Sequence, residues 1–149
     1  MKLEDYLEKD FIIPDLKANT KSEVLKELIA PIAAKKSGFD PEKAHGVLME
    51  RERLGTTGIG DGVAIPHGKL DNIEDIILVV GRSSSGVDFE ALDFKHCTVF
   101  FLVLAPEQVA GMHLRILAHI SRLLKDEGFR RSFGAASDQE SLWRLLLQT

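Results

Sequence analysis

The residue most clearly set up for chemistry is His67, in the segment GIGDGVAIPHGK over 58–69. Residues 63–65 predict a short strand that runs into Pro66 and His67, and ligands of open α/β sheets gather beyond the carboxyl ends of strands. Pro66 fixes one backbone torsion, and Gly68 lets the chain turn away and leaves space beside the ring. A neutral imidazole, with a pKa of about 6.5, is a nucleophile at cellular pH. The alternative is a turn histidine without chemistry.

His113 opens the apolar stripe of a helix that the sequence predicts over 111–125. One interpretation is a core histidine that hydrogen-bonds to a neighbouring loop. The other is an imidazole at the mouth of a cleft, beside the positive end of the helix dipole. The residues three, four, seven and eleven positions further on, which share its helical face, are Ile116, Leu117, Ile120 and Leu124.

The other three histidines lie in contexts that favour surface or structural positions. His45 is flanked by charged residues on a predicted helix, and His96 precedes a strand, in a loop or edge position. His119 shares a helical face with Arg115 and Arg122, and we expect that face to be solvated. None of these three histidines is expected to carry the chemistry.

Several other reaction classes lack their residue patterns. Cys97 is the only cysteine and opens an apolar strand, which predicts a buried, inert thiol rather than a nucleophile. The sequence has no G-x-S-x-G elbow and no H-x-x-x-H or C-x-x-C metal spacing. The glycines at 58, 60 and 62 lead into a strand, and no G-K-[ST] follows them. We therefore predict neither a metal nor a cofactor, which leaves the imidazole itself as the nucleophile.

Composition and charge narrow the class of protein. The 149 residues are 44% hydrophobic and 28% charged, which suits one domain with a sizeable core. The formal charge of −4 argues against nucleic acid as the main partner, because phosphate backbones need a basic face. The charged N-terminal segment lacks the apolar core of a signal peptide, and the longest apolar run, 99–105, is too short to span a bilayer. We expect a cytoplasmic protein without membrane insertion.

The first half of the chain predicts a short helical turn, an extended run and two helices. A capping-box pattern over 20–23 opens the first of these helices, which is expected to end near Gly38. Asp40 is the expected N-cap of the second, which stops at Gly55. The buried stripe of the second helix is expected to comprise Ala44, Val47, Leu48 and Leu54.

The second half predicts strands followed by helices. The runs 76–80 and 98–104 are typical of strands buried on both faces, and the serine-rich segment 83–86 between them predicts a turn. Later helices are expected over 111–125, near 129–134, and from a second capping box at 137–140 through Leu147. This order predicts one α/β domain, with a small sheet of four or five strands covered by helices on both faces.

Three segments together resemble the enzyme IIA proteins of the bacterial phosphotransferase system, in the fructose/mannitol class. They are RERLGTTGIGDGVAIPHGKL around His67, the strand FFLVLAP, and HLRILAHISRLL from His113 onward. The resemblance covers essentially the whole chain, so that 1–149 would be a single EIIA type-2 domain. It implies a mixed, mainly parallel sheet of about five strands flanked by helices, in agreement with the pattern of elements.

The resemblance also implies roles for individual residues. His67 would accept a phosphoryl group from an HPr-like histidine phosphocarrier protein, so the chain would be a phosphotransferase component that works through a phosphohistidine intermediate. His113 would be the second active-site histidine and Arg51 the active-site arginine, although the residues alone do not distinguish Arg51 from Arg53. These roles suit phosphoryl transfer, because a charged fork and an imidazole hydrogen bond stabilise the negative charge of the transferring group.

Three outputs are compatible with this chemistry. The segment IPHGKL and the length of the chain make it most similar to the nitrogen-regulatory branch of the family, whose phosphorylation state regulates other proteins. The alternatives are a sugar-specific IIA component that passes phosphate to a IIB domain, and a non-catalytic binding module on the same fold. The joint presence of His67, His113 and Arg51 argues against the binding module. An exposed apolar docking patch is expected around the His67 cleft, with Val109, Ala110 and Met112 as candidates.

Overall fold

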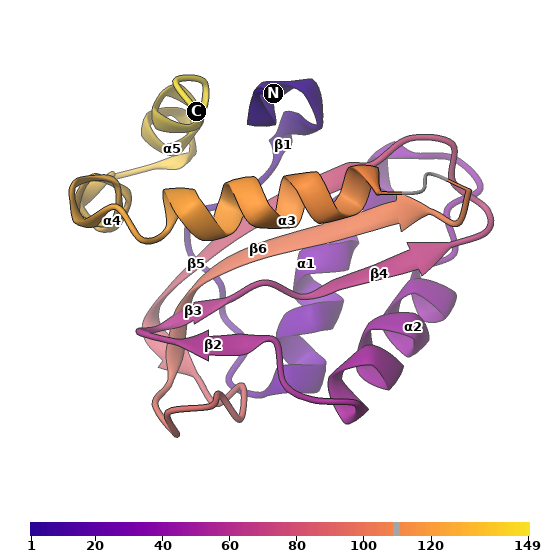
Figure 1. Ribbon diagram of the computed structural model, residues 1–149, viewed down its shortest axis with the longest axis horizontal. Coiled ribbons are helices and arrows are strands. Elements are labelled where there is room, and N and C mark those ends of the chain that lie inside the picture. The colour runs from indigo at the N-terminus through magenta and orange to yellow at the C-terminus, as the bar shows by residue number, and fades with distance from the viewer. Residues whose placement is uncertain (109–110) are drawn as a thin grey trace.

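The computed structural model describes residues 1–108 and 111–149, and its chain path is shown in Figure 1. A 3-10 helix over Leu3–Asp5 comes first. The strands are β1 (Leu7–Ile13), β2 (Gly58–Gly60), β3 (Val63–Ala64), β4 (His67–Leu70), β5 (Ile77–Val87) and β6 (Cys97–Pro106). The α-helices are α1 (Lys21–Lys35), α2 (Pro41–Arg53), α3 (Met112–Leu123), α4 (Glu127–Ala135) and α5 (Gln139–Leu146).

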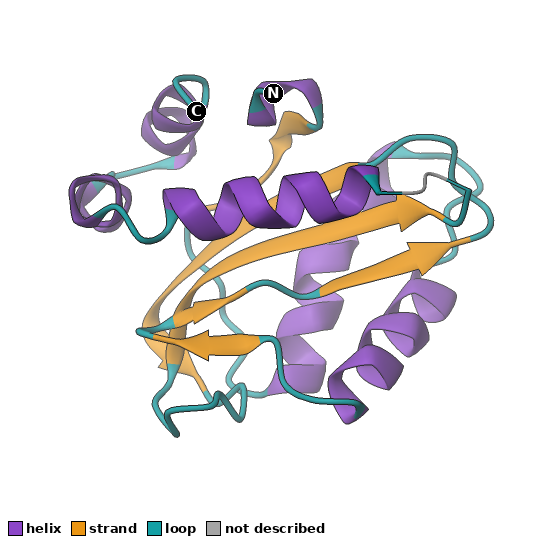
Figure 2. Ribbon diagram, viewed as in Figure 1, coloured by secondary structure: helices purple, strands orange, loops and turns teal. Residues whose placement is uncertain are grey.

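The strands form one mixed sheet in the middle of the molecule, with helices on either side (Figure 2). The described sheet has six strands in the order β1-β5-β6-β3-β2, with β4 also paired to β6. The pairs β1–β5, β3–β6 and β4–β6 are parallel, whereas β5–β6 and β2–β3 are antiparallel. The predicted mixed α/β architecture is confirmed, with one strand more than the expected five.

The additional strand arises from a break in the strand next to β6, at residues 65–66. Ala64 lies opposite Phe100 and His67 lies opposite Val103, so the offset against β6 is the same on both sides of the break. β3 and β4 are therefore two segments of one interrupted strand that runs alongside β6. β2 pairs with β3 but not with β4, so from Pro66 onward β6 is the only strand partner in the described sheet. Pro66 is tolerated because its missing N–H is needed by no strand on the open side.

This register overturns one prediction about the site. We expected His67 beyond the carboxyl end of a strand, with the chain turning away at Gly68. Instead, His67 begins β4, which continues to Leu70 alongside β6. The histidine therefore lies part-way along the sheet edge, and the segments before and after it are both held by pairing with β6.

Both faces of the sheet are covered by helices and carry part of the core. Phe100 packs edge-to-face against Phe89, with ring centroids 5.6 Å apart, on the side of α1, whose Lys21 lies over the Phe89 ring. The next residue, Phe101, packs against Phe133 of α4 with centroids 6.0 Å apart. Successive strand residues point to opposite faces. Figure 1 accordingly shows α1 and α2 on one side of the sheet and α3 on the other.

The predicted starts of the first two helices are confirmed. The side chain of Thr20 accepts a hydrogen bond from the backbone N–H of Glu23, and Asp40 caps α2 in the same way. The last helix begins one residue later than predicted, because its cap is the carboxylate of Asp138 and not the side chain of Ser137. Short polar side chains satisfy the free N–H groups at each of these helix starts.

The segment 83–86 is not the predicted turn. It lies inside β5, which runs on to Val87 with an irregular register against β6 after Arg82. Cys97, at the start of β6, is buried as predicted, and burial raises the pKa of its thiol to about 11. None of the described helices is both long and apolar enough to cross a membrane.

Candidate functional site

A cavity of about 400 Å³ opens where α2, β4 and the beginning of α3 meet. It brings together His67, His113 and Arg51, the three candidates from the sequence, although they lie far apart in the chain. The full lining comprises Val47, Glu50, Arg51, Leu54, His67, Gly68, Lys69, Val103 and His113.

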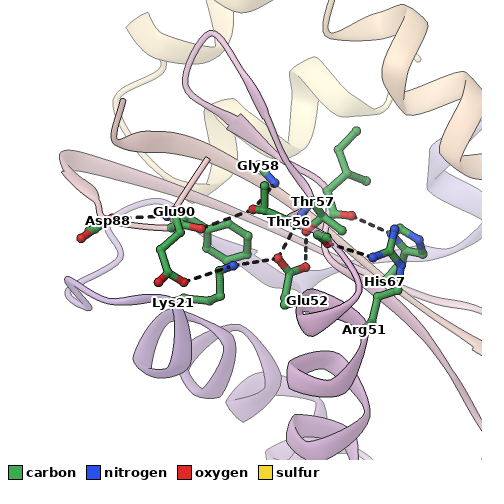
Figure 3. A network of polar contacts seen from close by, with 12 residues as sticks. Lys21, Arg51, Glu52, Thr56, Thr57, Gly58, His67, Asp88 and Glu90 are labelled. Atoms are coloured by element: carbon green, nitrogen blue, oxygen red, sulfur yellow. Dashed lines mark hydrogen bonds and ion pairs between the residues drawn. The ribbon is translucent and has the colours of Figure 1, made fainter. Parts of the chain in front are cut away.

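The imidazole of His67 is held in one orientation by the backbone. Its Nδ1 atom lies 2.9 Å from the carbonyl oxygen of Ile65. A carbonyl oxygen can only accept a hydrogen bond, so Nδ1 carries the hydrogen and donates it. In the neutral ring, Nε2 then has a free lone pair. The half-buried side chain lines the cavity beside Arg51 (Figure 3).

The cavity depends on the close approach of α2 to β4 at Gly68. A Cβ atom at this position would lie 2.8 Å from the Cγ1 atom of Val47, which is closer than a real contact allows. Glycine therefore lets α2 pack directly on the strand. Because Arg51 lies one helical turn after Val47, this packing brings the guanidinium to the cavity.

One face of α2 is directed at the cavity rather than at the core. Val47, Glu50, Arg51 and Leu54 follow one another at the three- and four-residue spacing of a helix face, and all four line the cavity. Leu54 was predicted to be buried, but its side chain is 83% exposed. Ala44 and Leu48 are fully buried as predicted and Val47 is half-buried against the core, so the error concerns Leu54 alone.

The structure separates the two arginines that the sequence alone did not distinguish. Arg51 lines the cavity, and its Nη1 atom donates a hydrogen bond to the carbonyl of Gly55 at 2.9 Å. This contact fixes the guanidinium while leaving its other N–H groups free to bind an anion. Arg53 instead forms an exposed ion pair with Glu50 on the same helix.

His113 lies in the first turn of α3, which begins after Gly111. Its Nδ1 atom is buried and has no hydrogen-bond partner among residues 1–108 and 111–149. The first turn of the helix contains no acidic residue, so the positive end of the helix dipole is not neutralised there. The helix dipole therefore favours a negatively charged group near the start of α3.

Burial is the main influence on the charge of His67, and it lowers the pKa of the imidazole below its usual value. The neighbouring Arg51 guanidinium and His113 imidazole lower this pKa further, whereas the hydrogen bond to Ile65 and the carboxylate of Glu52 raise it. The net effect keeps His67 neutral at cellular pH. A neutral ring is the form that can act as a nucleophile.

We therefore expect an NMR titration of the His67 ring to show a midpoint below the ordinary imidazole pKa of about 6.5. Between the two pKa values the unfolded chain binds a proton that the folded chain does not, so stability falls as the pH is lowered through that window. A midpoint for His67 at or above about 6.5 would contradict the expectation.

The remaining histidines lie outside this cavity. His96 is exposed in the loop before β6, as predicted. His45 is half-buried, and its Nε2 atom lies 3.2 Å from the Oγ of Ser22, which links α2 to α1. His119 is also half-buried, and its buried Nε2 atom has no hydrogen-bond partner in the described parts of the chain, so the prediction that its helical face is solvated is wrong there.

A larger hollow of about 950 Å³ lies elsewhere, between β5 and α4, and contains none of the three candidates. Its Arg82 donates hydrogen bonds to the carbonyl oxygens of Pro14, Phe133 and Ala136. These bonds give Arg82 a structural role, joining the sheet to α4. Within the part of the chain that the structure describes, no cluster of three His, Cys, Asp or Glu side chains could hold a metal ion.

Nearly the whole chain matches one known protein family. Residues 5–149 match the family described as "Phosphoenolpyruvate-dependent sugar phosphotransferase system, EIIA 2". The chain belongs to this EIIA 2 family. The match extends over the strands and helices that build the cavity, in agreement with the resemblance carried by the three sequence segments.

Relatives of this EIIA 2 chain fall into two groups. A nitrogen regulatory protein of Bradyrhizobium diazoefficiens is 40% identical over 98% of this chain and 95% of its own length. The crystal structure of the nitrogen regulatory protein IIA-Ntr from Neisseria meningitidis has a TM-score of 0.89 at 28% identity, covering 97% of this chain and 98% of its own. The fructose-specific EIIABC component of Bacillus subtilis is 29% identical over 99% of this chain but only 23% of its own length.

The mouth of the EIIA 2 cavity only partly matches the predicted docking patch. Val109 and Ala110 lie outside the described residues. Met112 is half-buried, and its sulfur lies 3.8 Å from the hydroxyl of Tyr6, so it packs toward the N-terminal segment. Among the described residues that line the cavity, Leu54 is apolar and exposed, although its predicted position was the core.

Proposed function

We propose that His67 accepts a phosphoryl group at Nε2 from an HPr-like histidine phosphocarrier protein, and that the phosphorylation state of the chain has a regulatory, nitrogen-related output. The observation that carries the proposal is the hydrogen bond from Nδ1 to the carbonyl of Ile65. It leaves the Nε2 lone pair available in a cavity lined by Arg51 and His113.

The proposed step exchanges one nitrogen–phosphorus bond for another. The Nε2 lone pair attacks the phosphorus atom of the donor phosphohistidine, the donor P–N bond breaks, and its electron pair returns to the donor ring. The His67 ring gains positive charge as the new bond forms. The Ile65 carbonyl, which accepts the Nδ1 hydrogen at 2.9 Å, supports that charge throughout the step.

The surroundings suit the negative charge of the transferring group. Phosphoryl transfer depends on positioning and on stabilising the equatorial oxygens. Arg51 offers guanidinium N–H groups, and the imidazole of His113, which lines the same cavity, can hydrogen-bond a phosphoryl oxygen. The start of α3 adds the positive end of a helix dipole.

The regulatory output rests on the nitrogen regulatory protein of B. diazoefficiens, which aligns over nearly its whole length. The second candidate, a sugar-specific IIA component that donates to a IIB domain, is favoured by the similarity to the fructose-specific EIIABC component of B. subtilis. Both candidates use the same chemistry at His67 and differ only in where the phosphoryl group or its signal goes.

The test is incubation with phosphoenolpyruvate, enzyme I and a histidine phosphocarrier protein, followed by intact mass spectrometry. We expect the gain of one acid-labile phosphoryl group, and ³¹P–¹⁵N NMR to locate it on Nε2 of His67. No gain with a competent donor would contradict the phosphocarrier function. Efficient onward transfer to a fructose-type IIB domain would favour the sugar-specific output over the regulatory one.

A further inference from the structure

A buried carboxylate lies directly behind the proposed phosphorylation site. Glu52, the residue after Arg51 on α2, is only 7% exposed. Its carboxylate accepts hydrogen bonds from Thr57, from the backbone N–H at 3.0 Å and from the side-chain hydroxyl. The Nζ atom of Lys21 lies 3.2 Å from the same carboxylate (Figure 3). None of these contacts is required to explain the cavity itself.

A chain of hydrogen bonds joins this carboxylate to the imidazole. The carbonyl of Thr57 accepts the backbone N–H of Ile65 at 3.0 Å. The carbonyl of Ile65 in turn accepts the Nδ1 hydrogen of His67 at 2.9 Å. We propose that Glu52 is a positioning residue for His67, acting through Thr57 and Ile65 to set the ring orientation and tautomer. The expected effect on the phosphorylation rate rests on the proposed function, whereas the expected effect on the tautomer does not.

Neighbouring residues of α2 hold the same loop at two points. Arg51 donates to the carbonyl of Gly55, and Glu52 accepts from Thr57, so the end of the helix fixes the loop at two residues. Thr56, between them, donates from its hydroxyl to the carbonyl of Phe89 at 3.4 Å. The loop is therefore tied to α2 on one side and to the segment after β5 on the other.

The approach of the following strand leaves little freedom in this arrangement. A Cβ atom at Gly58 would lie 2.8 Å from the side chain of Ala91 and 2.9 Å from its backbone. The loop residue Thr57 is consequently confined between Glu52 and the close packing of Gly58 on Ala91. A change at Glu52 is therefore passed along the backbone to Ile65 rather than absorbed by the loop.

Lys21 compensates the charge of the buried Glu52 carboxylate, and its second partner, Glu90, offers a control substitution. A buried carboxylate needs a counter-charge, and Lys21 provides it with a side chain that is only 11% exposed. Lys21 also contacts the exposed carboxylate of Glu90 at 3.5 Å. Among the described residues Thr57 hydrogen-bonds to Glu52 and not to Glu90, so Glu90→Gln removes a charge beside Lys21 while the hydrogen-bonded path to His67 stays intact.

The deciding experiment compares Glu52→Gln with Glu90→Gln in the full chain. We expect ¹⁵N NMR of Glu52→Gln to show a lower fraction of the Nδ1–H tautomer in the neutral His67 ring. We also expect phosphorylation by phosphoramidate, a small-molecule donor, to slow about tenfold, as misplaced reacting groups do. Glu90→Gln is expected to match the wild type in both measurements.

A second pair of variants covers the case in which Glu52→Gln does not fold. Thr57→Val removes the hydroxyl that Glu52 accepts from, and Thr57→Ser retains it. We expect a smaller, about threefold loss of rate and a tautomer shift in Thr57→Val, with both restored in Thr57→Ser. Folded Glu52→Gln or Thr57→Val proteins with wild-type tautomer and rate would overturn the inference. A tautomer shift without phosphorylation of any variant, wild type included, would instead contradict the proposed function alone.

Discussion

His67→Ala is expected to abolish phosphoryl acceptance while leaving the fold intact. No other described histidine combines a ring nitrogen facing the cavity with a backbone hydrogen bond that fixes the opposite nitrogen. The substitution removes a half-buried side chain at the sheet edge, so we expect a stability cost of about 1 kcal/mol. Intact mass after incubation with the phosphocarrier system measures the first effect, and thermal unfolding measures the second.

The matched control for this prediction is His96→Ala. His96 is exposed in the loop before β6 and lies outside the cavity, so its removal should leave phosphorylation unchanged. A His67→Ala protein that still gains a phosphoryl group would place the acceptor on another residue. The half-buried His45 and His119 would then be the first to test.

Local signals were sufficient to predict most of the elements. The caps Thr20 and Asp40 define helix starts through contacts within four residues, and such contacts do not depend on the rest of the fold. The apolar runs at 76–80 and 98–104 became the central strands β5 and β6 because they are buried on both faces. The turn predicted at 83–86 is wrong because this segment continues β5 as an irregular stretch between the pairs Arg82–Val99 and Val87–Cys97.

The errors near the site share a different cause. The strand β4 exists because it pairs with β6, a segment more than thirty residues later in the chain. No local pattern therefore predicts that strand pairing resumes at His67 after Pro66. Leu54 follows the helical periodicity of Val47 but faces a cavity rather than the core. Periodicity identifies a common face, whereas what the face meets is decided by long-range packing.

Glu52 was missed although the sequence contains a usable signal. It lies four residues after Leu48 and eight after Ala44, both of which are fully buried. A carboxylate on the core face of a helix needs a buried partner, so this spacing alone justified a search for one. The identity of that partner, Lys21 on α1, could come only from the packing of two helices.

Arg51→Gln is expected to slow phosphoryl transfer to His67 by about 10²–10³-fold, as the loss of a preorganised charge-stabilising group does in enzymes. Glutamine can still donate a hydrogen bond to the carbonyl of Gly55, so the loop should remain in place. Arg51→Lys is expected to recover only part of the rate, because lysine keeps the charge but not the planar fork. Single-turnover kinetics with the phosphorylated carrier protein provide the measurement.

Arg53→Gln is the matched control, since Arg53 lies two residues away, is not among the residues that line the cavity, and forms an exposed ion pair. A wild-type rate in Arg51→Gln would contradict the proposed role. The choice of donor separates two ways in which Arg51 could act. If it stabilises the transferring group itself, the loss should be similar with phosphoramidate and with the carrier protein. If it only helps the carrier dock, the rate with phosphoramidate should be unaffected. The contact with Gly55, which holds the guanidinium beside the imidazole, leads us to expect the first result.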